Sequence, residues 1–358
     1  MRQITVNLPN NRYTLHIASS ALQGLPEVIK GVTRSKVLVV TDDTVKGLYG
    51  QQVVDLLNEA NIEHRMLSLP AGEPTKSFKG LEQIYATLAE GGYTRSDALI
   101  ALGGGVIGDL TGYAAATWQR GMKLIQVPTT LLSQIDSSIG GKTAINTPWG
   151  KNLVGAFKQP DAVVIDTDVL STLSDEDFAG GMAEMIKTAC LTKGVDMDTI
   201  IEAGGRQGIA PLLPKLIADC CDYKRQIVEE DELDKGTRML LNLGHTLAHA
   251  LEPMGDWVRW THGQAVSLGL IRILRCAEAE GLTEIGTAKV IKEALEAYGL
   301  PTQWPGVPEA EVMAILKRDK KVAEGAIALS LIKAIGDPFL YTVSLENVDN
   351  FFRGRGMS

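Results

Sequence analysis

Histidine is scarce in this chain, and three of the five histidines lie within 18 residues of one another. His245 and His249 are spaced to share one face of a helix, either as two metal ligands or as one ligand beside a proton-transfer group. His262 follows, and Glu184 in GGMAEMIK offers a carboxylate after two glycines that would permit close approach. A catalytic metal site needs three protein ligands and an open position. Spacing leaves His249 as eligible a ligand as His245, and it equally allows histidines that only pack in the core or cap helices.

A glycine-rich turn indicates a dinucleotide site. The segment ALGGGVIGDL follows an apolar run, and Gly103, Gly105 and Gly108 fit the pattern GxGxxG at the start of a helix. Glycines there let the backbone approach a pyrophosphate at the helix N-terminus, where free amides and the helix dipole favour an anion. A tight strand-to-helix turn is the simpler alternative. The acidic ribose ligand that usually follows the next strand is missing, because KLIQVPT ends in proline and threonines.

Other strand ends must therefore supply the ribose ligand. Asp42 follows the run KVLVVT, and Glu73 and Lys76 follow the run HRMLSLP. In an open parallel sheet, ligands bind at the carboxyl ends of the strands. We therefore expect these residues to face the same edge as the glycine-rich turn.

Two lysines that each follow a glycine indicate an anion site between residues 133 and 155. Lys142 and Lys151 lie beside small polar residues and Asn152, and a glycine exposes backbone amides next to the ammonium group. Either lysine could instead be a solvated side chain in a surface loop. Further candidate cations that sequence alone cannot bring together are Arg120, Lys187, Lys224, Arg238 and Lys320.

The elements that must hold these residues follow an α/β pattern. From residue 36 to about 166, strand-like runs (36–41, 64–70, 97–102, 123–129 and 162–166) alternate with helical patterns, one of them expected after Asp109. After Ser174, which resembles a helix N-cap, the pattern is almost wholly helical, with weak strand character in 326–336 and 338–345. We expect an α/β N-terminal domain with a parallel, Rossmann-like sheet over 1–170, and a mainly α-helical C-terminal domain over 171–358.

Composition narrows the functional classes. A formal net charge of -8 gives no general attraction to nucleic acid or to anionic membranes. No apolar run is long enough to span a membrane, so we expect a cytoplasmic protein. The four cysteines contain no CxxC pair and are expected to be reduced and structural. Thr246 stands where an HExxH metalloprotease carries its glutamate, which argues against peptide hydrolysis.

Six motifs occur together in one order and spacing: GGGVIGDLTGYAAATWQRG, VPTTLLSQIDSSIGGKTAIN, GKNLVGAF, GMAEMIK, NLGHTLAHALE and THGQAV. From about Asp42 to Lys320 the chain resembles the 3-dehydroquinate synthases. The resemblance implies a homodimeric, two-domain lyase of the shikimate pathway that uses NAD and zinc or cobalt. Such an enzyme converts 3-deoxy-D-arabino-heptulosonate 7-phosphate to 3-dehydroquinate and phosphate for chorismate and aromatic amino acid biosynthesis.

The resemblance also implies roles for single residues. It assigns Glu184, His245 and His262 to the metal and His249 to the phosphate of the substrate. The residues it implies for NAD are Asp42, Glu73, Lys76, Gly103, Gly104, Gly105, Val106, Gly108, Asp109, Thr129, Thr130, Lys142 and Lys151. Those implied for the substrate are Asp136, Lys142, Asn152, Lys187, Lys224, Arg238, Asn242, His249 and Lys320, with Arg120 reaching it from the partner subunit. The implied catalytic residues are Asp136, Lys142, Lys187, Asp234 and His249.

Two positions depart from the family pattern. The usual HGE is HGQ here, with Gln264, and the usual DExE is DELD, with Asp234. If Gln264 replaces a carboxylate that supports the metal ligands, metal affinity or rate could fall about 10 to 100-fold. Its amide oxygen can still accept a hydrogen bond, so we expect tuning and not loss. Three alternatives remain: a related sugar phosphate cyclase, a metal-dependent alcohol or glycerol dehydrogenase, and a catalytically silent relative that only binds ligand.

Overall fold

The computed structural model describes residues 2–255, 259–317, 322–323 and 325–353. The chain forms two compact units, which we describe separately. The first comprises residues 1–173 and 224–233, and the second comprises 174–223 and 234–358. Helix α9 (Leu213–Glu230) contributes to both, because the chain rejoins the first unit at Lys224.

The first unit is built on a seven-stranded sheet with the order β1-β2-β9-β6-β5-β3-β4. β1 and β2 are antiparallel, whereas every other pair of neighbours in this sheet is parallel. The predicted parallel sheet is therefore confirmed, and an N-terminal hairpin extends it at one edge. The strands are β1 (Arg2–Leu8), β2 (Asn11–Ala18), β3 (Val37–Asp42), β4 (His64–Leu69), β5 (Ala98–Gly103), β6 (Lys123–Pro128) and β9 (Ala162–Asp166).

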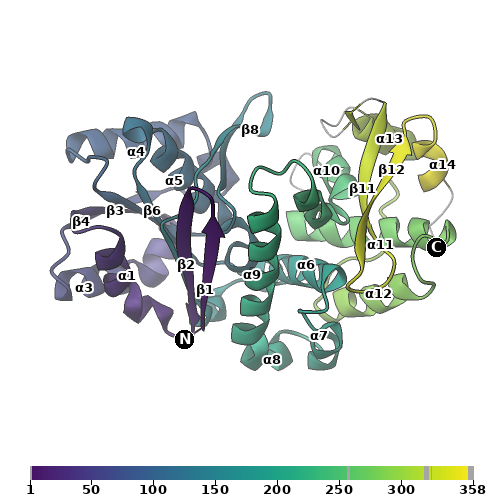
Figure 1. The fold of residues 1–358 in the computed structure, drawn as a ribbon, viewed down its shortest axis with the longest axis horizontal. Helices are drawn as coiled ribbons and strands as arrows, with labels where there is room; N and C mark the ends of the chain where they lie inside the picture. Colours follow the sequence, from purple (N-terminus) through teal and green to yellow (C-terminus); the bar gives the residue numbers. More distant parts are fainter. Residues whose placement is uncertain (1, 256–258, 318–321, 324, 354–358) are drawn as a thin grey trace. The chain divides into compact units, whose positions relative to one another are not determined.

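Helices cover both faces of this sheet (Figure 1). Val37 and Val39 of β3 join the core under α1 (Leu25–Val32) and α3 (Gln51–Glu59), whereas the intervening Leu38 joins the core under α4 and α5. Burial on both faces explains why the strands read as continuous apolar runs. The other helices of this unit are α4 (Phe78–Glu90), α5 (Gly105–Thr117), α2 (Asp43–Val45), η1 (Ala21–Gly24), η2 (Lys46–Gly50), η3 (Glu73–Thr75), η4 (Trp118–Arg120), η5 (Ser133–Ser137) and η6 (Thr167–Thr172).

Two local expectations were wrong. Helix α5 begins at Gly105, directly after the glycine-rich turn and not after Asp109. The segment considered as a surface loop forms an antiparallel hairpin of β7 (Lys142–Thr147) and β8 (Gly150–Phe157), which packs on α5 through β7. The ladder is irregular between Ile145 and Thr147, so Asn146 lies at a bulge. Bulges commonly redirect a side chain next to a functional site.

The second unit is mostly helical. Helix α6 begins after the predicted N-cap Ser174, whose hydroxyl accepts a hydrogen bond from the amide of Asp177 at 3.0 Å. The helices are α6 (Asp175–Leu191), α7 (Met197–Ala203), α8 (Arg206–Ile209), η7 (Ala210–Leu212), η8 (Thr237–Asn242), α10 (His245–Met254), α11 (His262–Ala279), α12 (Thr287–Ala297), α13 (Glu309–Leu316) and α14 (Val348–Phe352).

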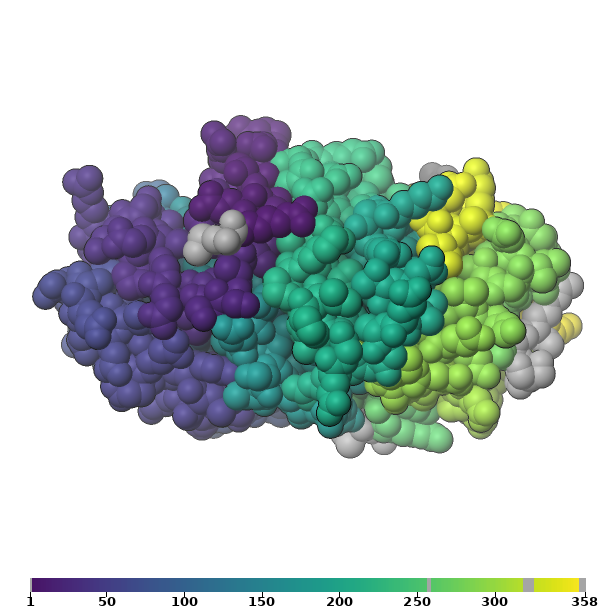
Figure 2. Space-filling model, turned by 90° about the horizontal axis from the view of Figure 1, so that it is seen from below, coloured from purple at the N-terminus to yellow at the C-terminus, as the bar shows by residue number. Residues whose placement is uncertain are grey.

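The two C-terminal segments with weak strand character form a hairpin in this unit. β11 (Ala326–Ile332) and β12 (Pro338–Ser344) are antiparallel, and the short β10 (Val322–Ala323) adds a third strand. This C-terminal segment, yellow in Figure 2, lies against the light-green helices of the same unit and contacts α11. Within the part of the chain that the structure describes, every helix is too short or too polar to cross a membrane.

Candidate functional site

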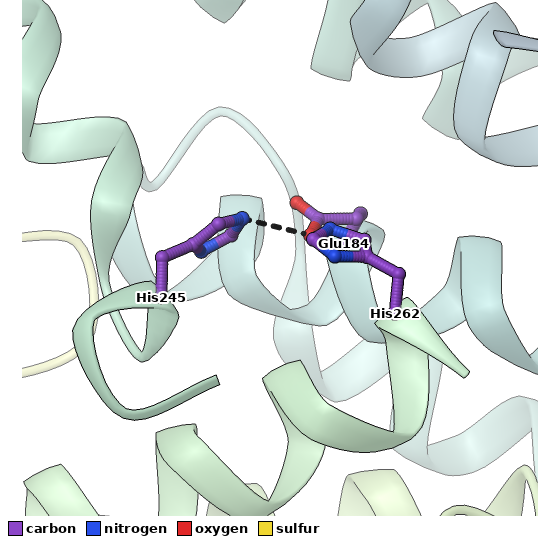
Figure 3. Close-up of side chains that lie close together, drawn as sticks. All are labelled: Glu184, His245 and His262. Carbon is purple, nitrogen blue, oxygen red and sulfur yellow. Dashed lines mark ion pairs between the residues drawn. The ribbon is translucent and has the colours of Figure 1, made fainter. Parts of the chain in front are cut away.

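Three side chains from separate helices of the second unit converge on one point (Figure 3). Glu184 comes from the middle of α6, and His245 and His262 are the first residues of α10 and α11. One ligand atom from each lies within 4.8 Å of the others. The Nε2 atoms of both histidines are 3.3 Å from Oε1 of Glu184. The arrangement offers two imidazole nitrogens and one carboxylate, the donor set of many zinc enzymes.

Glycines allow the three helices to approach so closely. A methyl group on Gly263 would lie 2.3 Å from Cα of Gly180, so α11 and α6 touch backbone to backbone next to the ligands. A methyl group on Gly269 would lie 2.2 Å from the carbonyl oxygen of Gly244, where α10 begins beside α11. Gly244 also has a left-handed φ of 77°, which favours glycine. The predicted close approach near Glu184 therefore depends on Gly263, because a methyl group on Gly180 would meet no atom within 4 Å.

Both histidines are held by their second ring nitrogen. The Nδ1–H of His245 donates to the carbonyl oxygen of Leu243 at 3.2 Å, and that of His262 donates to Oε1 of Glu252 at 3.0 Å. A carbonyl and a carboxylate can only accept, which assigns a proton to Nδ1 of each ring and leaves Nε2, which is directed at Glu184, as the nitrogen that can bind a metal. Partners of this kind orient metal-binding histidines in general.

The charges in this cluster favour a cation. Glu184 is 1 % exposed, and neither of its oxygens makes a hydrogen bond of normal geometry, although Nζ of Lys187 lies 2.5 Å from Oε2. Burial opposes its ionisation, but Lys187 and His245 outweigh this and hold the pKa of Glu184 well below its ordinary value. Burial lowers the pKa of His245, which keeps that imidazole neutral. Burial also acts to lower the pKa of His262, but Glu184 and Glu252 outweigh it and raise the value to about 10. A buried, ionised carboxylate with two imidazole nitrogens directed at one of its oxygens fits a divalent cation.

His249 lies on the same helix as His245, and the centroids of the two rings are 5.6 Å apart. The group of three ligand atoms within 4.8 Å does not include His249.

Of the cations and amides predicted to bind substrate, Arg238 is buried in η8 and Asn242 ends that element. Lys187 is buried one helical turn after Glu184, whereas Lys320 lies outside the described residues.

In the first unit, the strand ends predicted to bind a dinucleotide lie at one edge of the sheet. β3 and β5 are parallel neighbours, and the chain leaves them in opposite directions, toward β4 and toward β6. Ligands bind at such switch points in open sheets. Asp42 ends β3 and its carboxylate caps α2, accepting from the amide of Val45 at 2.9 Å. Gly103 ends β5, and a methyl group there would lie 2.7 Å from Ile107, so packing also requires this glycine.

Several predicted residues meet beside this edge. Lys76 is buried, forms an ion pair with Asp109, and donates from Nζ to Oδ1 of Asn152 at 2.6 Å. Burial raises the pKa of Asp109 although Lys76 opposes the shift. Asn146, which the sequence did not single out, donates to Oε1 of Glu73 at 2.7 Å and accepts from the amide of Asn152 at 3.1 Å. From its position in the bulge, Asn146 thus links Glu73, which is predicted to bind NAD, with Asn152, which is predicted to bind the phosphate.

A second pair joins two residues predicted to contact substrate. Lys224 forms an ion pair with the carboxylate of Asp136 and donates to its main-chain oxygen at 2.6 Å. The remaining predicted residues of this unit occupy the turns and strands around the same elements. Gly104 is the N-cap of α5, Gly105, Val106 and Gly108 lie in its first turns, Thr129 and Thr130 follow β6, Lys142 begins β7, and Lys151 lies in β8.

Three predicted residues have an unusual backbone. Arg120, Asn152 and Asp234 are left-handed, with φ of 67°, 56° and 57°. Few non-glycine residues adopt this conformation, and those that do are concentrated at functional sites. Asparagine and aspartate tolerate it better than arginine, so the backbone at Arg120 carries the greater strain.

The side-chain oxygen of Gln264 is engaged at the start of its own helix. That oxygen accepts from the amide of Thr261 at 3.0 Å, and the hydroxyl of Thr261 accepts from the amide of Gln264, which forms a capping box for α11. The carboxylate that holds His262 is Glu252, seven residues after His245 on α10. The sequence signal that could have found Glu252 is this spacing, which places it on the helix face of His245.

Comparisons with known proteins cover nearly the whole chain. Residues 66–180 match the family model for the 3-dehydroquinate synthase N-terminal part, and residues 181–322 match that for the C-terminal part. The chain is 40% identical over 355 residues to 3-dehydroquinate synthase of Enterococcus faecalis (strain ATCC 47077 / OG1RF), with 99% of each chain covered. It is 38% identical over 353 residues to that of Streptococcus sanguinis (strain SK36), with 98% of this chain and 99% of the relative covered.

Two solved structures share the fold. One is 2-deoxy-scyllo-inosose synthase complexed with carbaglucose-6-phosphate, NAD+ and Co2+, with a TM-score of 0.87, 22% identity, and coverage of 99% of this chain and 100% of that one. The other is 2-epi-5-epi-valiolone synthase from Streptomyces hygroscopicus subsp. jinggangensis 5008 with NAD+ and Zn2+ bound, with a TM-score of 0.85, 22% identity and 98% of both chains covered.

Proposed function

Because the chain belongs to the 3-dehydroquinate synthase family, we propose that it converts 3-deoxy-D-arabino-heptulosonate 7-phosphate to 3-dehydroquinate and phosphate. The enzyme is a lyase of the shikimate pathway that uses NAD and one zinc or cobalt ion. The observation that carries the proposal is the cluster of Glu184, His245 and His262. In this cluster the Nε2 atoms of two imidazoles are both directed at one oxygen of a buried carboxylate.

The two cofactors supply chemistry that side chains lack. A divalent cation held by Glu184, His245 and His262 would polarise adjacent hydroxyl groups of the substrate and make one of them easier to oxidise. NAD would accept a hydride and return it, so the reaction has no net redox change. The neighbours with NAD+ and Co2+ or Zn2+ support this pair of cofactors.

The side chains of the protein bind and orient the substrate in this proposal. Arg238 holds the carboxylate of the substrate, because its planar guanidinium can donate two parallel hydrogen bonds, and Lys224 adds a second positive charge. Lys187, already paired with Glu184, would contact a ring hydroxyl, as would Asp136. Holding the substrate in a reactive geometry supplies a large part of such a rate enhancement.

Phosphate is both the leaving group and the group by which the substrate is positioned. We assign it to Lys142, Asn152, Asn242 and His249, with Lys320 and, from the partner subunit, Arg120. The strained backbone at Arg120 and the fixed left-handed backbone at Asn152 support these assignments. Asp234 and His249 join Asp136, Lys142 and Lys187 as the proposed catalytic residues.

For the dinucleotide, we propose the strand ends and turns of the first unit. The switch between β3 and β5 supports this location, as does the helix N-terminus at the glycine-rich turn. We further propose that 1–170 acts as the NAD-binding domain and that 171–358 is a mainly helical domain for metal and substrate. A homodimer in the cytoplasm completes the proposal, without nucleic-acid or membrane partners. The net charge of -8 supports the absence of nucleic-acid and membrane partners, and the four free, buried thiols support the cytoplasm.

An assay of phosphate release tests the function. Purified protein with NAD and Co2+ or Zn2+ should release phosphate from the seven-carbon substrate without accumulating NADH. Release from a hexose 6-phosphate alone would indicate a related cyclase, and NADH formed from glycerol would indicate a dehydrogenase. The relatives of 38% to 40% identity carry the 3-dehydroquinate synthase name, which favours the first outcome.

A further inference from the structure

We propose that Glu252 is the positioning residue of the metal centre: it fixes the ring of His262, so the affinity for the metal depends on Glu252 and is insensitive to the Gln264 departure. The inference rests on the metal site of the proposed function. It adds a residue that acts on the metal only through His262, and it removes Gln264 from that role.

The two histidines differ in how firmly their surroundings hold them. The side chain of His245 is 10% exposed, and a carbonyl of its own chain segment, that of Leu243, accepts its Nδ1–H. The side chain of His262 is 36% exposed, so packing restrains its ring much less. A mobile imidazole loses conformational freedom when it binds a metal, which weakens binding. His262 is therefore the ligand for which a dedicated hydrogen bond matters most.

Glu252 supplies that hydrogen bond from another helix. Its side chain is 12% exposed, and Oε1 lies 3.0 Å from Nδ1 of His262, while Nε2 of the same ring is 3.3 Å from Oε1 of Glu184. The imidazole thus lies between two carboxylates, with Nδ1 donating to Glu252 and Nε2 directed at Glu184 and at the proposed metal position. A carboxylate at Nδ1 also increases the basicity of the ligating nitrogen.

The placement of Glu252 follows from helix geometry. His245 and Glu252 are seven residues apart on α10, which puts them two turns apart on one helix face. Helix α10 therefore provides one ligand directly and orients the other through Glu252. Because Gly244 and Gly269 bring α10 and α11 into backbone contact, the distance from Glu252 to His262 is set by the packing of two rigid elements.

The side-chain oxygen of Gln264 already makes a hydrogen bond within its own helix start. Its Oε1 accepts from the amide of Thr261 in the capping box, two residues beyond His262. A glutamate at this position would accept the same hydrogen bond, since glutamate and glutamine both complete a capping box. The HGE and HGQ motifs are therefore equivalent for the start of α11, and neither provides the partner of Nδ1.

Metal affinity of the full chain, measured without NAD or substrate, tests the proposal. Co2+ is competed against a chromophoric chelator, and the absorption spectrum of bound Co2+ reports the coordination geometry. We expect Glu252→Ala to weaken Co2+ binding by about 10 to 100-fold and to change the spectrum. Glu252→Gln should recover part of the loss, because its amide oxygen still accepts from Nδ1–H. The matched variant Gln264→Glu should bind Co2+ within about twofold of the wild type, since the capping box remains.

Thermal unfolding of each metal-free variant separates orientation from folding. If Glu252→Ala unfolds at a lower temperature than the wild type and Glu252→Gln does not, the test rests on Glu252→Gln, which keeps the shape and packing of the side chain. A Co2+ affinity of Glu252→Gln below that of the wild type then supports the proposal. A Co2+ affinity equal to that of the wild type overturns it. Unchanged affinity and spectrum in a folded Glu252→Ala variant also overturn it, as does a large gain in affinity in Gln264→Glu. Failure of the wild-type chain to bind Co2+ would instead refute the proposed metal site.

Discussion

Replacing Gly263 with alanine should disturb the metal centre without changing any ligand. Gly263 follows His262 at the start of α11, and an added methyl group would lie 2.3 Å from Cα of Gly180 and 2.8 Å from its carbonyl oxygen. Non-bonded carbon atoms prefer separations of about 3.5–4.0 Å. Relief of the clash thus requires α6 and α11 to separate by about 1.2 Å or more, because both contacts are to backbone.

This displacement should have a large effect on metal binding and a modest effect on the free energy of unfolding. Metal–ligand distances tolerate changes of about 0.2 Å, so moving His262 away from Glu184 by several times that amount should weaken Co2+ binding at least about tenfold. Overpacking costs about 1–3 kcal/mol, and the gain from alanine over glycine in a helix offsets about 0.5–1 kcal/mol of that. We therefore expect the free energy of unfolding to fall by about 0.5–2 kcal/mol, measured by urea denaturation of the metal-free chain.

Gly180→Ala is the matched control because it lies at the same helix contact. A methyl group on Gly180 would meet no atom within 4 Å, so this variant should keep its Co2+ affinity and gain up to about 1 kcal/mol of stability. Wild-type affinity in Gly263→Ala would refute the reasoning. Equal damage in both variants would also refute it, since the effect would then reflect the loss of glycine and not the direction of the added methyl group.

Two further predictions concern the first unit. Asn146→Ala should raise the dissociation constant for NAD several-fold, measured by titration without substrate, because Glu73 loses its amide donor and Asn152 loses the acceptor for its backbone amide; an unchanged constant would show that the contacts at the bulge do not support the cofactor site. Burial opposes ionisation of Asp97, but hydrogen bonds from Ser35 and Thr94 outweigh it and hold the pKa of this carboxyl below its ordinary value. The stabilisation it provides is present above the ordinary value and is lost as the pH falls through the lowered one. Asp97→Asn should therefore lower the free energy of unfolding by about 1–3 kcal/mol at pH 7, with the difference from the wild type shrinking below about pH 4 in urea titrations; a difference independent of pH would contradict the assignment.

The parallel sheet could be predicted from sequence because burial on both faces leaves continuous apolar runs. The β7–β8 hairpin was missed although a signal existed: Pro148 and Gly150 mark a turn between two runs with strand character. Its glycines and lysines instead suggested a loop. An isolated two-stranded hairpin is only marginally stable, so the packing of β7 on α5 helps to hold it, and local sequence does not show that packing.

The candidate metal cluster shows a different limit. Spacing placed His245 and His249 on one face but could not tell which of them points toward Glu184, because that depends on how α10 packs on α11. Asn146 acts through Glu73, which is distant in sequence, and local patterns do not register such contacts. The spacing of His245 and Glu252 puts both on one helix face, but it does not identify His262 as the partner of Glu252. The HGQ motif left the role of Gln264 open, and the structure shows that its side-chain oxygen caps its own helix.

Residues 224–233 belong to the first unit although they follow residues 174–223 of the second, and this topology constrains the order in which the first unit can fold. Lys224 pairs with Asp136, Glu232 accepts from Gln159, and Glu229 accepts from the backbone amide of Asn7. During synthesis the sheet can assemble once β9 emerges, but these contacts must wait for about 60 more residues, most of which belong to the other unit. A fragment that ends at residue 173 would keep the whole sheet and still lack a segment that ties to its first strand, so neither unit can be excised as one continuous stretch of chain.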